Sequence, residues 1–503
     1  MPAVVCIDVG STWTKAAAVD TLTGELVGTA SHPTTIGGDV MTGINAVRAA
    51  LAESRPALAG ADSIACSSAG GGLRLAVVGY ERIVTAEAGA RVGVSAGARV
   101  VHVSGGRLTP DGMAELAGAN PDIVLLVGGT DGGNADTLLA NANRLATAGA
   151  ALAVPVVVAG NVEARDEVVE RLEAGGVRAL PTANVLPRIG VLAPAPARSA
   201  IREVFIRHVI GGKHLSDSPD FAAMVRAATP DAVLTGVEML ADGAADVSGV
   251  GDVVVVDVGG ATTDAYSVTT PDPEEANLHR EVVEIMWRTR TVEGDLGVRW
   301  SAPGVVQAAL AERLVTADEA GVLAAEATVR AARPDSLPAS ERDREVDARL
   351  AELALTIALR RHARPQESGE VRTPGKDLRR VRLVVGSGGV LRHASAGRLA
   401  AILRPALADR GGGWKVPAAA NLAVDVSYVL AAAGLLARDH PVAAARLVSG
   451  ALLPVPVSGI ATVAATATAD TPAVARNATR KVKTSDRRPA TRGPRNVPAS
   501  DDI

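Results

Sequence analysis

The feature that most constrains the fold is a pattern that the chain contains twice. It occurs in residues 4–19 (VVCIDVGSTWTKAAAV) and again in residues 253–268 (VVVVDVGGATTDAYSV). Each copy is an apolar run that ends at a carboxylate, followed by glycine and hydroxyl residues and then by a second run. Short runs rich in β-branched residues predict strands, and such strands belong in a sheet that is covered on both faces. The repeat therefore predicts two halves built on one plan.

The turns of the two predicted hairpins have a composition that suits a phosphate and a metal ion. Gly10, Gly259 and Gly260 let backbone N–H groups approach a ligand closely, because no side chain stands in the way. The carboxylates of Asp8 and Asp257 suit Mg²⁺ and its bound waters. For either copy alone, the alternative is an ordinary β-hairpin with glycines in its turn and solvated acids.

A third glycine-rich element lies in the second half of the chain. It is VRLVVGSGGVLRH, residues 381–393, and it places Gly386, Gly388 and Gly389 after a predicted strand and before a predicted helix. At such a junction the backbone can approach a flat ring or a ribose. Many α/β proteins contain one element of this kind, whereas three in this order form a specific signal.

The order of the three motifs resembles the ATPase superfamily of actin, sugar kinases and DnaK-type chaperones. In that superfamily two related halves clamp Mg-ATP in a cleft. The resemblance implies an α/β chain with a two-lobed, actin-like (ribonuclease H-like) ATPase fold, and Mg²⁺ held through water by Asp8 and Asp257. It also implies that ATP is bound by glycine and hydroxyl residues, namely Gly10, Ser11, Thr12, Gly259, Gly260 and Thr262 at the phosphates, and Gly386, Gly388 and Gly389 at the adenosine.

Further segments narrow the resemblance to one family. They are SSAGGGLRLAVVG (67–79), IVLLVGGTDGGN (123–134) and VEGDLGVRWSA (292–302). Together with the three motifs they resemble the MutL family encoded beside glutamate mutase, which is unrelated to the mismatch-repair protein of that name. The resemblance implies an ATP-binding, chaperone-like reactivating factor whose partners are subunits of an adenosylcobalamin-dependent mutase such as glutamate mutase. Slow Mg-ATP hydrolysis would drive closure of the lobes.

We expect two lobes and a tail. The first lobe covers residues 1–250 and contains an insertion at about 95–215, the second covers 251–455, and the tail covers 456–503. Strand and helix patterns alternate in the insertion, which predicts βαβ units with parallel strands. The tail is rich in Ala, Thr, Pro, Arg and Ser without periodicity, so we expect it to be disordered.

The insertion contains a possible second site in GGTDGGN, residues 128–134. Gly129, Asp131 and Asn134 lie between a strand end and a helix start, a position that can bind an anion. They would then contact a substrate, a phosphate or a partner, and the segments at 161–166 and 181–187 would line the same edge. The alternative is a tight turn in which Asp or Asn caps the helix.

Phosphoryl transfer depends mainly on positioning and on neutralisation of charge. Lys15 is the cation beside the first turn, although it could instead be a strand lysine that extends to solvent. We expect Thr262 or Asp264 to orient the attacking water.

Two alternative functions stay open. The first alternative function is a small-molecule kinase, for which Asp131 is the candidate base. The second is a nucleotide-dependent scaffold without hydrolysis.

Three long helices are predicted outside the motifs. Residues 230–242 and 419–437 are rich in Ala and Gly and would cross between the lobes, either as a hinge or as simple packing. Residues 341–365 (ERDREVDARLAELALTIALRRHARP) form an amphipathic helix whose charges we interpret as a solvated surface.

Composition excludes several functional classes. The chain has a net charge of −4, and residues 471–503 contain eight Lys or Arg against three Asp, so the rest carries about −9. With 2% aromatic residues, this argues against binding of nucleic acid. Cys6 and Cys66 cannot form a disulfide framework and read as buried residues. No apolar run approaches the roughly 18 to 20 residues that span a bilayer, so we expect a cytoplasmic protein.

Overall fold

The structure is a computed structural model. It describes residues 2–69, 73–81, 85–148, 152, 154–206, 215–270, 287–368, 371–373 and 375–456. The expected tail lies outside the described residues from position 457 onward. No helix in the described part of the chain is both long and apolar enough to cross a membrane.

The first lobe is built on a five-stranded sheet with the order β10-β4-β1-β2-β3. Its strands are β1 (Ala3–Val9), β2 (Trp13–Asp20), β3 (Leu26–Pro33), β4 (Asp62–Ser67) and β10 (Val225–Ala228). The first three strands form an antiparallel meander, and β4 lies parallel to β1 and to β10. Helix α1 (Val40–Ser54) is capped by Asp39, whose side chain accepts a hydrogen bond from the Met41 amide, and it buries Ile44, Val47 and Leu51.

The second lobe repeats this topology. Its sheet has the order β15-β14-β13-β18-β19-β20, with β13 (Val253–Val258), β14 (Thr263–Val268), β15 (Arg288–Glu293), β18 (Leu383–Ser387), β19 (Asn421–Val424) and β20 (Leu453–Val455). Again three strands form an antiparallel meander, and two more add in parallel to the first of them. The shared order confirms the two-lobed α/β fold that the repeated motif predicted.

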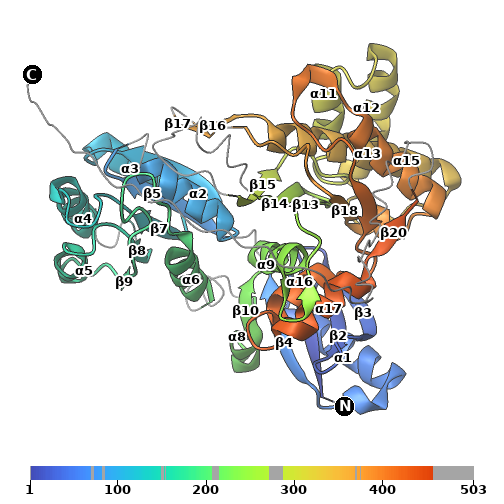
Figure 1. Ribbon diagram of the computed structural model, residues 1–503, viewed down its shortest axis with the longest axis horizontal. Coiled ribbons are helices and arrows are strands. Elements are labelled where there is room, and N and C mark those ends of the chain that lie inside the picture. Colours follow the sequence, from blue (N-terminus) through green and yellow to red (C-terminus); the bar gives the residue numbers. More distant parts are fainter. Residues whose placement is uncertain are drawn as a thin grey trace, which may run out of the picture. The chain divides into compact units, whose positions relative to one another are not determined.

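The insertion has a parallel sheet of its own, of which Figure 1 labels β5, β7, β8 and β9. Its strand order is β6-β5-β7-β8-β9, and every pairing is parallel. The first strand, β5, starts at Arg74, ahead of the range expected for the insertion. The elements are β5 (Arg74–Gly79), α2 (Glu87–Ser95), β6 (Arg99–Gly105), α3 (Pro110–Gly118), β7 (Ile123–Leu126), α4 (Asp136–Ala148), β8 (Val156–Val158), α5 (Arg165–Ala174), β9 (Ala179–Pro181) and α6 (Pro194–Val204).

Two helices pack between the sheets of the lobes. They are α9 (Thr229–Asp242) and α16 (Val429–Leu436), and they share one apolar cluster with strands of both sheets. A Cβ atom on Gly236 would overlap the carbonyl oxygen of Leu430, and one on Gly434 would overlap that of Ala232. The two helices therefore touch backbone to backbone.

The prediction of one helix over 419–437 was wrong at its start. Residues 421–424 form β19, and α16 begins only at Val429. A short apolar run fits a buried strand as well as a buried helix, so periodicity alone does not separate them. By contrast, the helix predicted over 230–242 is present as α9.

The remaining elements complete the lobes. They are a 3-10 turn (Pro56–Leu58), α8 (Pro219–Met224), β11 (Gly243–Ala244), β12 (Val247–Ser248), α11 (Ala302–Ala311), α12 (Ala317–Ala332), α13 (Glu341–Ala363), β16 (Gln366–Ser368), β17 (Val371–Thr373), α14 (Gly389–Arg392), α15 (Ala396–Ala408), a 3-10 turn (Gly411–Gly413) and α17 (Pro441–Ala451).

Candidate functional site

The turns of the two hairpins have the same backbone hydrogen bond. The amide of Gly10 donates to the carbonyl of Trp13 at 3.1 Å, and the amide of Gly259 donates to that of Thr262 at 2.9 Å. A Cβ atom at either glycine would lie 2.8 Å from the same carbonyl oxygen. Glycine is therefore required at both positions to close the turn. Ser11 and Thr12 are exposed at the tip of the first turn.

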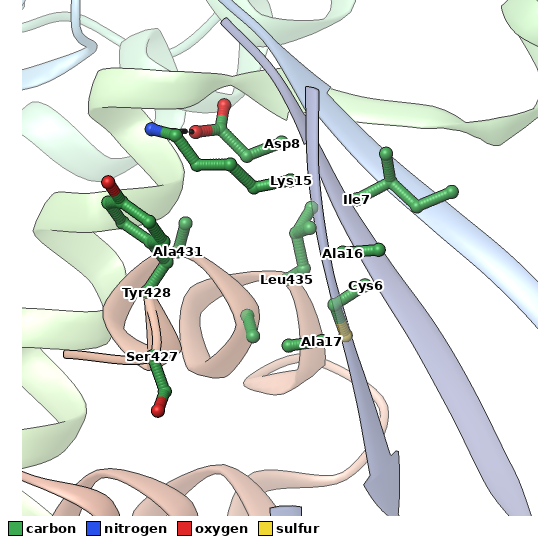
Figure 2. A pocket seen from close by; sticks show the side chains of 11 residues that line it. Cys6, Ile7, Asp8, Lys15, Ala16, Ala17, Ser427, Tyr428, Ala431 and Leu435 are labelled. Atoms are coloured by element: carbon green, nitrogen blue, oxygen red, sulfur yellow. Dashed lines mark ion pairs between the residues drawn. The ribbon is translucent and has the colours of Figure 1, made fainter. Parts of the chain in front are cut away.

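Asp8 is a buried carboxylate at the end of β1. One carboxylate oxygen accepts a hydrogen bond from the Thr229 hydroxyl at 2.6 Å, and the other lies 3.5 Å from the ammonium of Lys15. The thiol of Cys66 donates weakly to Asp8 at 3.7 Å. Both cysteines are free and buried, as expected. Figure 2 shows Asp8 and Lys15 facing each other from adjacent strands.

Asp257 is the equivalent carboxylate at the end of β13. Its neighbour on the adjacent strand β18 is Ser387. Burial raises the pKa of Asp257 and the charge of Asp8 raises it further, while Lys15 and Ser387 act in the opposite direction. Because such charge effects weaken with distance, Asp8, Lys15 and Asp257 lie close enough to act on one another, although they come from different sheets.

Lys15 directs its ammonium into the site. The ammonium lies 4.0 Å from the centre of the Tyr428 ring, and a small pocket is lined by the two residues together with Asp8 and apolar residues of α16 (Figure 2). Burial alone would lower the pKa of Lys15, but the negative groups around it, Asp8 first, raise it above its ordinary value. This geometry favours the interpretation of Lys15 as a site cation over that of a lysine extending to solvent.

Asp264 faces Asp257 across the second hairpin. It forms an ion pair with the buried Arg290 at 3.0 Å, and Arg290 also donates to the carbonyl of Gly97 in the insertion at 3.0 Å. Burial raises the pKa of Asp264, and Arg290 opposes this rise. The structure therefore gives Asp264 a strong partner, which the sequence did not indicate.

The second turn is covered by the segment that contains GDLGVRW. The amides of Val298 and Arg299 donate to the carbonyls of Gly259 and Gly260 at 3.0 and 2.8 Å. The Thr263 hydroxyl donates to the Leu296 carbonyl at 2.5 Å. These bonds fix the shape of the turn, and Thr262 stays half-buried beside it.

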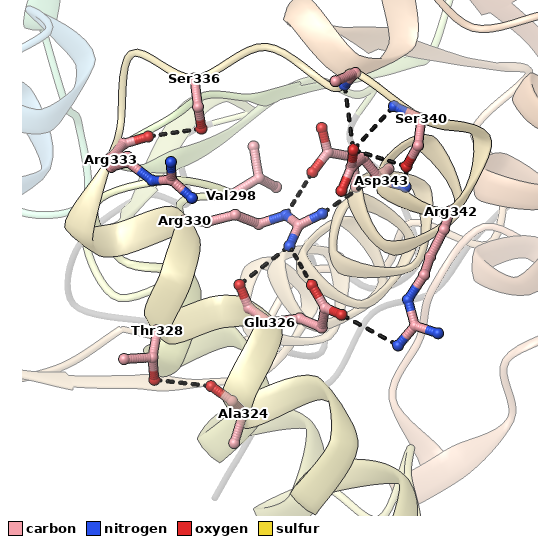
Figure 3. Close-up of polar contacts among 12 residues, drawn as sticks. Val298, Ala324, Glu326, Thr328, Arg330, Arg333, Ser336, Ser340, Arg342 and Asp343 are labelled. Carbon is pink, nitrogen blue, oxygen red and sulfur yellow. Dashed lines mark hydrogen bonds and ion pairs between the residues drawn. The ribbon is translucent and has the colours of Figure 1, made fainter.

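The covering segment is itself anchored by buried ion pairs on α13. Asp347 accepts from Arg299 and from Arg330, each at 2.7 Å, and Arg330 also binds Glu326 of α12 (Figure 3). Arg360 is buried as well and pairs with Asp409 at 2.6 Å. The expectation that the charges of this helix form a solvated surface was therefore wrong for these residues, because α13 lies against other helices on that side.

The third motif packs its glycines against the second hairpin. Gly388 has a φ of 109°, and a Cβ atom there would overlap the carbonyl oxygen of Val258. The Gly386 carbonyl accepts from the Asp425 amide at 2.9 Å. Gly389 is exposed, and a Cβ atom there would meet nothing within 4 Å. Gly388 is thus required by its contact with backbone, a Cβ atom on Gly386 would overlap the side-chain end of Leu391, and Gly389 borders open space.

Sequence reasoning missed several residues around Asp8 and Asp257. Thr229, Asp425 and Tyr428 lie next to the predicted residues, and Arg392 contacts the Tyr428 ring at 4.6 Å. Asp425 comes directly after the apolar run of β19, much as Asp8 ends the apolar run of β1, so that pattern could have identified it. Nothing in the sequence around Tyr428 or Arg392 indicates that these two residues lie near the predicted site residues.

In the insertion, the possible second site has the geometry of a capped turn. The Asn134 side chain accepts from the Asp136 amide at 2.7 Å, and Gly129 has a φ of 68°. Asp131 accepts from the Asn184 side chain at 2.8 Å and from the Val162 amide at 3.2 Å. The three loops meet at one edge, as expected. These internal bonds account for the residue types, and ligand binding at this edge stays a prediction.

Comparisons with known proteins place the chain in a family. The family model described as MutL protein matches residues 4–452. The chain is 36% identical over 477 residues to Protein MutL from Clostridium tetanomorphum, across 90% of this chain and 100% of that protein.

Among solved structures, ethanolamine utilization protein EutJ from Carboxydothermus hydrogenoformans is 11% identical, with coverages of 89% of this chain and 90% of that chain and a TM-score of 0.27. A diol dehydratase-reactivating factor is 12% identical, with coverages of 88% and 100% and a TM-score of 0.33. These two scores are too low to support an argument, whereas the family model and the curated relative agree. The chain belongs to the MutL family.

Proposed function

We propose that this protein binds Mg-ATP between its two hairpins and acts as a chaperone-like reactivating factor for an adenosylcobalamin-dependent mutase such as glutamate mutase. The observation that carries the proposal is the approach of Asp8 and Asp257. They occupy equivalent places in two copies of one hairpin, and the charges of both act on Lys15. Family membership supports the accessory role.

The residues present fit a magnesium ion held through water. Asp8 and Asp257 provide hard oxygen ligands, and no cluster of three or more His, Cys, Asp or Glu in the described residues could hold a metal directly. Mg²⁺ usually keeps several of its waters and takes one or two carboxylates. When bound with ATP, it would neutralise charge on the phosphates.

The chain's own groups would supply the rest of the chemistry. Lys15 places a positive charge beside the phosphates, and Gly259 and Gly260 shape a turn that can approach them. Thr262 or Asp264 would orient the attacking water, with Arg290 holding Asp264 in place. We expect slow hydrolysis, because the further carboxylates near this turn, Glu293 and Asp295, are both paired with Arg361.

Closure of the lobes would couple the binding of nucleotide to the interaction with the partner enzyme. Helices α9 and α16 lie between the two sheets and touch through Gly236 and Gly434. Small residues at such a contact permit sliding of packed helices. ATP would favour the closed arrangement through its differential contacts with the two lobes. A mutase bound to the protein would then release its damaged cofactor.

Reactivation of an inactivated mutase tests the proposal. The mutase is incubated with the protein, Mg-ATP and fresh adenosylcobalamin, and its activity is followed against reactions without protein or without ATP. We expect recovery only in the complete mixture, and none with Asp8→Asn. Recovery equal to the control without protein would contradict the proposal.

ATP turnover separates the two alternatives. Stimulation by mutase subunits supports the reactivating factor, whereas stimulation by a metabolite indicates a kinase. Asp131, the candidate kinase base, already accepts two hydrogen bonds, so no observation favours that alternative. Partner binding that is unchanged by nucleotide and by Asp257→Asn would indicate a scaffold.

A further inference from the structure

Tyr428 has a backbone conformation that large residues seldom adopt. Its φ and ψ are 56° and 38°, in the left-handed region, directly before α16. This conformation is unfavourable for an L-residue with a side chain. Asp425 imposes it, because its carboxylate accepts from the amides of Ser427 and Val429 on either side of Tyr428, and from Leu430.

The strained backbone places the tyrosine ring against two cations from different lobes. The Lys15 ammonium of β2 lies 4.0 Å from the ring centre (Figure 2). The Arg392 guanidinium of α14 lies 4.6 Å from the same centre. Each contact is within the range of a cation–π interaction.

The charges around the ring do not balance. Lys15 has Asp8 as its counter-ion, whereas Arg392 has no carboxylate partner in the described part of the chain. Two cations that share one neutral ring repel each other, so an anion beside them is stabilised. Arg392 also ends the short helix that starts at the exposed Gly389. The arrangement is therefore suited to a ligand with several negative charges.

We infer that Tyr428 is a positioning residue that holds Lys15 and Arg392 as a pair of cations for the polyphosphate chain of the nucleotide. The inference rests on the proposed function for the identity of the ligand. It adds Arg392 as a phosphate-binding residue of the second lobe, and it gives a functional reason for the strained backbone of Tyr428. Because the ring contacts both lobes, it also fixes the distance between their cations.

Titration calorimetry with ATP and with inorganic tripolyphosphate, at low and high salt, tests the inference. Tyr428→Phe keeps the ring, and we expect its affinities to stay within about 2-fold of the natural protein. Tyr428→Leu removes the ring but keeps a branched side chain at the same strained position, so the backbone cost is matched. We expect it to bind both ligands about 10-fold more weakly.

Arg392→Gln should weaken binding of both ligands by about 10-fold and reduce the dependence of affinity on salt. The control is Arg364→Gln, which removes an arginine whose guanidinium lies 6.0 Å from the ring of Trp414 and pairs with Glu312 at 3.3 Å. Its affinities should not change. In the double variant Tyr428→Leu/Arg392→Gln, the losses should be less than additive, because the two residues act as one unit.

Affinities of Arg392→Gln equal to those of the natural protein would overturn the inference, and so would equal losses in Tyr428→Phe and Tyr428→Leu. If Tyr428→Leu does not fold, the comparison of Tyr428→Phe, Arg392→Gln and the control still decides. ATP binding that is unaffected by every variant refutes the inference and leaves the proposed function standing. Tripolyphosphate binding that depends on both residues, in a protein that binds ATP no better, supports the pair of cations and refutes the proposed function.

Discussion

At the scale of single residues, Asp257 carries an electrostatic cost. Burial raises the pKa of its carboxyl above the ordinary value of 3.8. An acid whose pKa is raised by folding lowers the free energy of unfolding once the pH exceeds its unfolded pKa, because folding then has to bury the charged form. Such a cost is common where a residue serves function rather than stability.

Asp257→Asn should therefore stabilise the protein in the absence of ligand and abolish binding of Mg-ATP. At pH 7 we expect the free energy of unfolding to rise by about 1 kcal/mol. The difference should vanish below about pH 4, where the natural carboxyl is protonated as well. Urea unfolding at both pH values and calorimetry with Mg-ATP provide the measurement. A variant less stable than the natural protein at pH 7 would show that the carboxylate stabilises the fold.

Lys376 is a second residue whose charged form is disfavoured in the folded protein. Burial lowers its pKa to about 8, with the charge of Arg91 acting in the same direction, and its ammonium donates to the His362 carbonyl at 3.2 Å. A lysine with a lowered folded pKa destabilises the protein below that pKa, and the cost disappears as the pH rises toward its unfolded value. Lys376→Met should thus raise the free energy of unfolding at pH 7 by about 1–3 kcal/mol. The gain should shrink between pH 8 and pH 10 in urea unfolding. A gain that does not vary with pH would mean that packing, not charge, is responsible.

At the scale of secondary-structure elements, the contact between α9 and α16 depends on glycine. We expect Gly434→Ala to destabilise the protein by about 3 kcal/mol or more, since the added methyl group would overlap the Ala232 carbonyl and force the helices apart. The matched control is Gly321→Ala in α12, where a Cβ atom meets nothing within 4 Å. There the better helix propensity of alanine should stabilise the protein by up to about 1 kcal/mol. Thermal unfolding compares the two, and equal effects would rule out a special contact between the crossing helices.

The same elements show how far the sequence can predict the structure. Both hairpins could be predicted because each begins with a continuous apolar run that ends at a carboxylate and turn residues, and α9 because its segment is rich in Ala and long enough for a helix. Strand β19 could not, because a short apolar run fits either a buried strand or a buried helix. Tyr428 and Arg392 lie 36 positions apart in the sequence, and only the folded chain brings them to one ring. The conformation of Tyr428 is imposed by Asp425, so local propensity does not predict it.

At the scale of the whole molecule, Arg290 connects the second hairpin with the insertion. It binds Asp264 in the second hairpin and the Gly97 carbonyl between α2 and β6. Gly97, with a φ of 78°, packs against the amide of Asp231 in the first turn of α9. Asp231 is almost fully buried and pairs with Arg198 and with Arg202 of α6, at 3.4 and 2.5 Å. The Thr229 hydroxyl in the same turn donates to Asp8. Asp8 and Asp264 are thus each linked to the insertion through polar contacts.

If these contacts transmit the effect of nucleotide binding to the insertion, Arg290→Lys should uncouple the insertion from the nucleotide site. Lysine keeps the charge beside Asp264 but lacks the planar group that reaches two acceptors at once, so ATP affinity should fall by no more than about 3-fold. Hydrogen exchange with and without Mg-ATP measures the coupling: the natural protein should show slower exchange in α2 and α6 when ATP is bound, and the variant should not. Arg288→Lys is the control, because Arg288 lies on the same strand and forms an exposed ion pair with Asp242. Slower exchange in both variants would mean that the insertion senses ATP by another route. Loss of the response in the Arg290 variant alone would show that the effect of nucleotide binding on the insertion depends on this buried arginine.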